Sequence, residues 1–264
     1  MGVDIDIDIL FEALSAVLGV TVRPKSCAPP EVVQSYCPLH PHPDVLSVND
    51  FLSAVWFDDE FWQDVQERKT GVRSRPSLRN DLFIMDDDFF DPRFDCDFTN
   101  VKDSGTYTRG GEIYKRPYGW KRFALKVLNK YPDGNAWLGS KGYRHGSDPH
   151  EWPVSYHGTS KQGAEGIIGS NYKAGSGAVY GRGIYSTPDI TVTERDGYAK
   201  KFTSKKNGKT YKVCLQNRIN PKVRKITSRS EYWLVPVPNG TPPDQERKIV
   251  MAAIRPYNLL LKEV

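Results

Sequence analysis

The segment 154–189, "VSYHGTSKQGAEGIIGSNYKAGSGAVYGRGIYSTPD", combines residue types that could bind and process a small molecule. His157 ends a short apolar run, a glycine-rich stretch follows, and Tyr185 comes just after it. An imidazole can donate or accept a hydrogen bond near neutral pH, and glycine lets a ligand approach the bare backbone closely. The combination indicates a binding site made of a histidine, a tyrosine and accessible main chain.

The glycine-rich stretch 174–183, "AGSGAVYGRG", fits neither of the common phosphate-binding motifs. It lacks the Gly-Lys-Ser/Thr ending of a P-loop. It also precedes a strand-like "GIYST", whereas a Rossmann turn follows a strand and opens a helix. Taken alone, the stretch indicates an ordinary loop.

A second group of residues has the side chains that zinc prefers, namely Cys27, Cys37, His40 and His42. Their spacing is not standard, because the thiols lie far apart in sequence and prolines flank the two histidines. A solvated loop is the favoured interpretation, and no metal site is predicted. The chain has 4 cysteines, which are too scattered for a disulfide framework, so reduced thiols are expected.

The elements that must position these residues alternate between strands and helices. The pattern predicts strands over 151–158, 209–219, 230–237 and 251–264, and helices over 119–131, 159–170 and 192–202. The first of these strands would deliver His157 at its end. The helix over 119–131 rests on one apolar stripe, made of Trp120, Phe123, Ala124, Val127 and Leu128.

The pattern of predicted elements changes near residue 100. Before it, apolar spacing predicts helices over 8–20 and 49–68, separated by a proline-punctuated loop. After it, short strands and helices follow one another. We therefore expect an α+β protein with a mainly helical N-terminal extension over 1–105 and a catalytic domain over 106–264.

Composition excludes several classes of protein. With 38% hydrophobic and 12% aromatic residues among 264, the chain is too rich in large apolar side chains for disorder. The net charge of +5 suits a polyanionic ligand without demanding one. No run approaches the roughly 18 apolar residues of a membrane helix, and the acidic N-terminus is unlike a signal peptide. An intracellular protein, cytoplasmic or nuclear, with no membrane partner is expected.

An ordered set of motifs gives the chain its resemblance to a known family. "YHGTS", "GRGIYSTPD", "GYAKKF", "SEYWLV" and "IRPYNLLL" occur in this order. The set resembles the catalytic domain of the diphtheria-toxin-like, or PARP-like, ADP-ribosyltransferases, which carry a His, a Tyr and a late Glu. The resemblance covers about residues 150–264. It implies split antiparallel β-sheets with flanking helices, and NAD+ as the substrate that donates ADP-ribose.

The resemblance also implies a role for each matching residue. His157 would bond ribose hydroxyls, the backbone of Gly158 would hold the nicotinamide carboxamide, and Thr159 would contact the adenine-side ribose. Tyr185 and Tyr198 would stack on the two faces of the nicotinamide ring, although Tyr198 lies slightly further along the chain than the family's spacing. The loop from Gly175 to Gly183 would close over the dinucleotide.

The catalytic carboxylate has two candidates. Glu231 opens "EYWLV" as the family's glutamate opens such a strand, whereas Glu246 lies in the insertion 236–248, expected to be a solvated, proline-rich loop. Glu231 is favoured as the group that stabilises the oxocarbenium-like transition state. The alternative for Glu231 is a surface carboxylate paired with Arg229.

The implied activity is transfer of ADP-ribose from NAD+ to a macromolecule with release of nicotinamide, and mono-transfer is favoured over polymer formation. A protein acceptor is the first expectation and a nucleic acid the second. Two alternatives stay open. One is a tRNA 2′-phosphotransferase-like NAD enzyme, which would need arginines such as Arg182, Arg195 and Arg229 lining its site. The other is an inactive module that binds without turnover.

Overall fold

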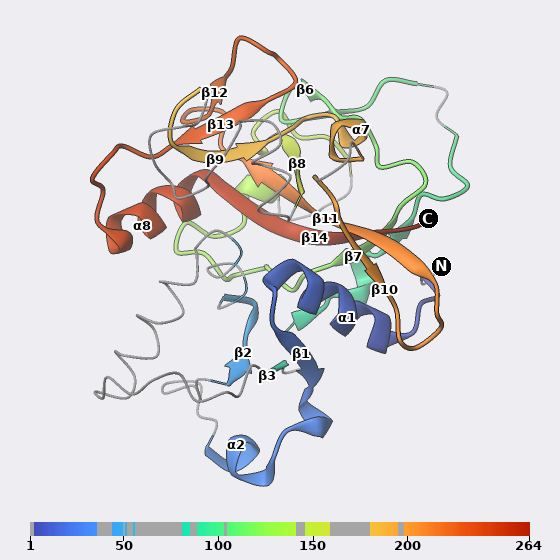
Figure 1. The fold of residues 1–264 in the computed structure, drawn as a ribbon. Coiled ribbons are helices and arrows are strands. Elements are labelled where there is room, and N and C mark those ends of the chain that lie inside the picture. The colour runs from blue at the N-terminus through green and yellow to red at the C-terminus, as the bar shows by residue number, and fades with distance from the viewer. Residues whose placement is uncertain are drawn as a thin grey trace.

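A computed structural model describes residues 3–35, 44–49, 51, 55, 81–84, 89–102, 105–140, 146–158, 180–194 and 198–264. The fold is α+β: several sheets, mostly antiparallel, with few helices (Figure 1). The predicted fold class is confirmed at this level.

The largest sheet has six strands and forms the centre of the molecule. Its order is β10 (Lys200–Thr203), β11 (Thr210–Ile219), β14 (Ile254–Glu263), β7 (Lys121–Ala124) and β4 (Cys96–Asp97), and β8 (Val154–Gly158) also pairs with β11. All these pairings are antiparallel. The two longest strands, β11 and β14, are buried along most of their length, as expected for central strands.

A second antiparallel sheet lies beside the end of β8. Its order is β12 (Lys225–Ile226), β13 (Trp233–Pro236) and β9 (Gly183–Ser186). Helix α8 (Pro243–Ala253) packs on it through a core that includes Trp233, Val235 and Val250. An isolated bridge between Tyr156 and Thr187 links this sheet to β8.

The N-terminal region begins with helix α1 (Ile7–Leu18), whose N-cap Asp6 accepts a hydrogen bond from the Asp8 amide at 3.0 Å. The helix ends at Gly19, whose φ of 72° is the left-handed conformation common at helix C-termini. A parallel sheet of order β1 (Thr21–Pro24), β3 (Asp81–Ile84) and β2 (Val45–Leu46) follows, with η1 (Lys25–Cys27) and α2 (Pro30–Ser35). The described part of this region therefore mixes helices with strands.

Three short elements and a hairpin complete the described fold. They are η2 (Pro92–Phe94), η3 (Ala136–Leu138), helix α7 (Ile190–Thr193), and the hairpin of β5 (Thr108–Arg109) with β6 (Glu112–Ile113). Helix α7 is the one that matters most for the site, because it lies against β8.

The main core crosses the predicted division at residue 105. Ile9, Leu10 and Leu14 of α1 belong to the same buried cluster as Val213 of β11 and Leu259 of β14. Strand β4 adds a further link, because it pairs directly with β7 in the central sheet. Residues on both sides of the division therefore share one core.

The helix predicted over 119–131 is wrong. Residues 121–124 form β7, which pairs with both β14 and β4, and Asn129 has a positive φ of 59° that ends any regular element. Trp120, Phe123 and Val127 are fully buried. The apolar residues of this segment also have the spacing of a helical stripe. The segment forms a strand because it pairs with the neighbouring strands β14 and β4.

Two further expectations are corrected by the described residues. The helix predicted over 192–202 ends at Thr193 in α7, and Lys200–Thr203 forms the edge strand β10 instead. The insertion 236–248 is not a solvated loop throughout, because Pro243 begins helix α8. Proline at the first helical position, with Asp244 and Glu246 in the first turn, was a usable helix signal.

The strand predicted over 209–219 is confirmed, and those predicted over 151–158 and 251–264 are confirmed from Val154 and Ile254 onward. Of the strand predicted over 230–237, Trp233–Pro236 is strand β13. The predicted helix over 8–20 is α1. The helices predicted over 49–68 and 159–170 lie wholly or mainly outside the described residues, as do Cys37, His40 and His42. In the described ranges Cys27, Cys96 and Cys214 are free thiols, and no helix there is long and apolar enough to span a membrane.

Candidate functional site

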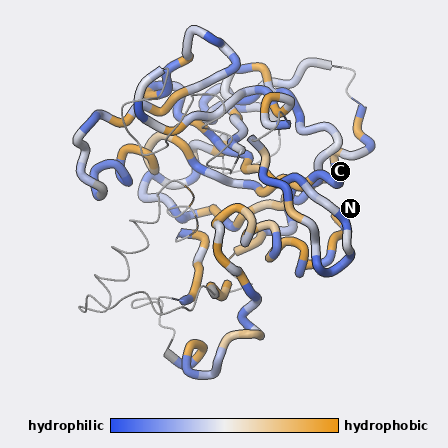
Figure 2. The backbone as a smooth tube through the Cα atoms, in the orientation of Figure 1, coloured by the Kyte–Doolittle hydropathy of each residue, from blue (hydrophilic) through white to orange (hydrophobic). Residues whose placement is uncertain are grey.

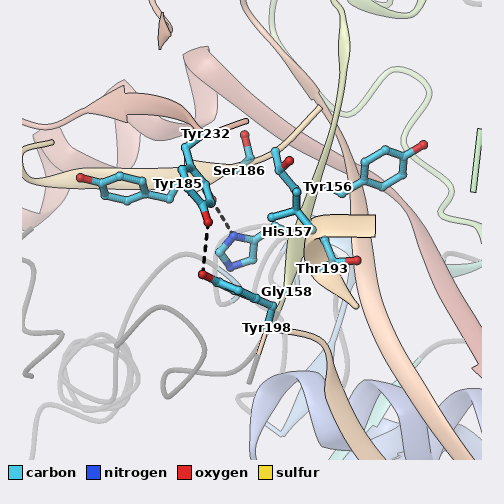
Figure 3. A pocket seen from close by; sticks show the side chains of 10 residues that line it. Tyr156, His157, Gly158, Tyr185, Ser186, Thr193, Tyr198 and Tyr232 are labelled. Atoms are coloured by element: carbon cyan, nitrogen blue, oxygen red, sulfur yellow. Dashed lines mark hydrogen bonds between the residues drawn. The ribbon is translucent and has the colours of Figure 1, made fainter. Parts of the chain in front are cut away.

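A cavity of about 430 Å³, its open mouth included, lies where β8 ends between the two sheets (Figure 3). It is lined by Tyr156, His157, Gly158, Tyr185, Ser186, Thr187, Val192, Thr193, Tyr198 and Tyr232. These residues come from β8, β9, α7 and the segments before β10 and β13. Segments that are distant in sequence thus converge on His157, at the strand end where the sequence predicted it.

His157 is held in one orientation and one tautomer. Its Nδ1 lies 2.8 Å from the backbone carbonyl oxygen of Tyr185, which can only accept, so Nδ1 carries the proton. Burial lowers the pKa of His157 below its ordinary value of 6.5, and the bond to the carbonyl offsets only part of that effect. At neutral pH the ring is therefore uncharged, and its Nε2 carries a lone pair that can accept a hydrogen bond.

Gly158 is required at the end of β8 by close packing. A Cβ at this position would overlap the carbonyl group of Tyr198 and lie 2.9 Å from its Cα. No rotation of a side chain could relieve this overlap, because the obstacle is backbone. The glycine therefore lets the chain at Tyr198 lie directly against β8.

Gly183 at the start of β9 is constrained in the same manner. Its φ of 151° is unfavourable for other residues, and a Cβ there would overlap the carbonyl oxygen of Val235 on β13. The preceding Arg182 accepts a backbone hydrogen bond from Val237 at 3.0 Å. Gly183 thus fixes β9, and with it Tyr185, against β13.

Tyr185, Tyr198 and Tyr232 line the cavity together with His157. Tyr198 and Tyr232 approach each other, with 3.4 Å between their hydroxyl oxygens. In Figure 3 the hydroxyl of Tyr185 points away from His157, and it donates to the carbonyl of Gly181 at 2.7 Å. Tyr198 therefore faces Tyr232 here, whereas the resemblance implied that Tyr198 would face Tyr185 across the nicotinamide ring. Tyr185 instead contributes its backbone carbonyl, which bonds His157.

The two candidate carboxylates both lie outside the cavity lining. Glu231 precedes the lining residue Tyr232, and its Oε1 accepts from Nη2 of Arg229 at 2.8 Å. The alternative pairing considered from the sequence is thus the one observed. Glu246, on α8, is bonded to Arg182, and the side chains of this pair are only 14% and 12% exposed. This pair ties α8 to the start of β9.

The sequence did not point to Tyr232 or to Thr193. Tyr232 is buried directly before β13, so its place at the start of the apolar run "YWLV" was a usable signal. Thr193 closes α7, and its hydroxyl donates to the Ile190 carbonyl at 2.7 Å. Thr159, Arg195 and most of the loop from Gly175 to Gly183 lie outside the described residues.

The lining is aromatic and polar but carries no fixed charge. Among the described lining residues there is no arginine, lysine or carboxylate. Of the arginines considered for a phosphate site, Arg182 and Arg229 are each paired with a glutamate. The cavity thus suits an aromatic or sugar group better than a phosphate.

Three comparisons with known proteins were negative: no family model, no curated protein and no solved structure matches this chain. Function must therefore be inferred from the residues of the cavity themselves.

Proposed function

We propose that this chain is an NAD-dependent ADP-ribosyltransferase that transfers a single ADP-ribose to a macromolecule and releases nicotinamide. The main support is one arrangement: a neutral imidazole of fixed tautomer, next to Gly158 and facing two tyrosines, in one cavity. A histidine, the glycine after it and tyrosines are among the residue types that the resemblance implies, and here they come from three separate segments.

In the proposed reaction the bond between nicotinamide and the ribose C1′ breaks, and the electron pair leaves with the nicotinamide. A nucleophile of the acceptor then bonds to C1′ and loses a proton. The products are ADP-ribosylated acceptor, nicotinamide and a proton. The ribose carbon gains positive charge as the bond breaks, so a nearby carboxylate stabilises the transition state more than the ground state.

His157 would serve the substrate through its Nε2, which can accept a hydrogen bond from a ribose hydroxyl. A protonated imidazole could not do so, and burial disfavours protonation. Tyr198 and Tyr232 would enclose the nicotinamide ring, and offset aromatic contacts add about 1 kcal/mol each beyond burial. These residues bind and orient the substrate.

Glu231 would supply the carboxylate, although it is paired with Arg229 here. The side chains of this pair are 59% and 28% exposed, for Arg229 and Glu231 respectively. Ion pairs this exposed stabilise by about 1 kcal/mol or less, so loss of the contact with Arg229 itself costs little. Glu231 adjoins Tyr232, which keeps it near the cavity.

The same ion pair favours a second candidate, a module that binds NAD or ADP-ribose without turnover. In that case Glu231 would remain a surface carboxylate and the cavity would act as a receptor. The tRNA 2′-phosphotransferase alternative gains no support from the described lining, which has no cation.

Nicotinamide release by the purified full-length chain separates the two candidates. The transferase should release nicotinamide from NAD, and labelled NAD incubated with a cell extract should leave label on a macromolecule. Binding of NAD by calorimetry without any release would establish the receptor instead. Neither binding nor release would reject both.

A further inference from the structure

A row of lysines crosses the central sheet next to the cavity. Lys201 of β10 is paired with Lys212 of β11, which is paired in turn with Lys262 of β14. Directly paired residues lie on one face of a sheet, so three ammonium groups share that face on adjacent strands. Like charges in this position destabilise a sheet unless a counter-charge is present.

Glu194 supplies part of that counter-charge. Its carboxylate accepts from Nζ of Lys262 at 2.8 Å, and also from the indole of Trp120 at 3.0 Å. Lys212 donates to the backbone carbonyl of Glu194 at 3.0 Å. Among the described residues the Glu194 carboxylate pairs with Lys262 alone in this row, so Lys201 and Lys212 leave a positive excess on this face.

The excess lies at the cavity end of the hairpin of β10 and β11, called here the lysine hairpin (residues 200–212). At its turn, Lys206 pairs with Asp6 and Asp8, and Lys209 pairs with Glu263. At the other end, Lys201 on this face and Lys200 on the opposite face of the edge strand β10 are both exposed, and neither makes an ion pair within the described ranges. Lys200 lies two residues after Tyr198, which lines the cavity.

The composition of this surface fits a phosphate backbone better than a protein. Figure 2 shows the turn of the lysine hairpin as strongly hydrophilic, and residues 200–212 contribute none of the exposed large apolar side chains. Protein interfaces are depleted in lysine and anchored by aromatic or apolar residues. Contacts to nucleic-acid phosphates, in contrast, are made by lysine and arginine and need no apolar anchor.

We propose that the lysine hairpin, with Lys262, binds the phosphate backbone of a nucleic acid and leads the strand past the cavity. Binding would be independent of sequence and would weaken steeply with salt, because each neutralised phosphate releases counterions. This property does not depend on NAD turnover. If the proposed function also holds, the bound strand is placed beside Tyr198 as an acceptor.

The test is fluorescence anisotropy of a labelled 20-nucleotide single strand with the full-length chain over a range of salt concentrations. The test variant is Lys200→Gln/Lys201→Gln, and the matched control is Lys222→Gln/Lys225→Gln. Both variants remove two charges from exposed lysines, but the control changes lie in and just before β12, away from β10 in Figure 1. We expect the test variant to bind about tenfold more weakly at low salt, with the slope of log K against log salt reduced by about 1.4.

Three results would overturn the proposal. One is wild-type protein that does not bind the strand at low salt. Another is a control variant that loses as much affinity as the test variant, since binding would then follow net charge and not the lysine hairpin. The third is displacement of the strand by polyglutamate at equal charge concentration, which would assign the surface to an acidic protein.

Discussion

Replacing Gly158 by alanine tests whether β8 and the chain at Tyr198 form one unit. The new Cβ would overlap the Tyr198 carbonyl group and lie 2.9 Å from its Cα. A distance under 3.0 Å is one that real Cβ atoms essentially never show, so either β8 or the Tyr198 segment must move.

The loss of stability expected for Gly158→Ala is large because the new Cβ would overlap backbone atoms. Inserting a methyl group into a packed site costs about 1–3 kcal/mol, and the upper end applies where backbone must shift. For a domain of this size each kcal/mol lowers the melting temperature by roughly 2–4 °C. A fall of about 6–12 °C is therefore expected, together with at least tenfold weaker NAD binding because Tyr198 is displaced.

The assay is thermal unfolding by circular dichroism, with NAD titration by calorimetry on the same samples. Gly105→Ala is the matched control, because a Cβ there meets nothing within 4 Å and its φ is ordinary. The control should melt at or slightly above the wild-type temperature. If Gly158→Ala behaves like the control in both measurements, the packing of Gly158 against Tyr198 is wrong.

Three further predictions concern the aromatic residues, the histidine and the N-terminal region. Tyr232→Ala should weaken NAD binding by about 1–3 kcal/mol by calorimetry. Tyr185→Ala should also weaken it, because it removes a side chain that lines the cavity, while the backbone carbonyl that bonds His157 stays. Unchanged affinity in both folded variants would reject the pocket. Because burial lowers the pKa of His157, its neutral state contributes stability that is present above pH 6.5 and is lost as the pH falls below that value, where the unfolded chain takes up a proton first. Urea unfolding at several pH values should show a smaller loss for His157→Gln, and an equal loss would contradict the assignment. A chain beginning at residue 106 should fail to fold, because it lacks α1 and the buried apolar residues that α1 adds to the main core. Burial of each such side chain stabilises by about 1.5–3 kcal/mol. A cooperative unfolding transition in that fragment would show that residues 106–264 fold as an independent domain.

The sequence predicted the strands whose pattern is local and long. Residues 209–219 and 254–263 are long segments that include aliphatic, β-branched and aromatic residues, and both form central strands. The sequence could not exclude a helix over 119–131, because this segment becomes a strand only by pairing with β14, about 140 residues away. Such long-range pairing leaves no trace in a local window.

In the site, too, local features could be predicted from the sequence and long-range contacts could not. His157 and Gly158 could be placed at a strand end from the sequence, and the structure brings them beside Tyr198. The approach of Tyr232 to Tyr198 depends on how the second sheet crosses β8, through a single bridge at Tyr156. The ion pair of Glu231 with Arg229 depends on side-chain orientation, which no motif specifies.

The most direct test of the central claim is NAD turnover by Glu231→Gln, with NAD affinity measured on the same protein. Glutamine keeps the shape of the side chain and removes the charge that matters as the glycosidic bond breaks, so affinity should change little while turnover falls about 100-fold or more. Glu246→Gln is the comparison: it breaks the pair with Arg182 and should lower stability, but the folded protein should keep its turnover. Loss of turnover in Glu246→Gln with normal turnover in Glu231→Gln would reverse the assignment of the carboxylate, and normal turnover in both would contradict the transferase mechanism.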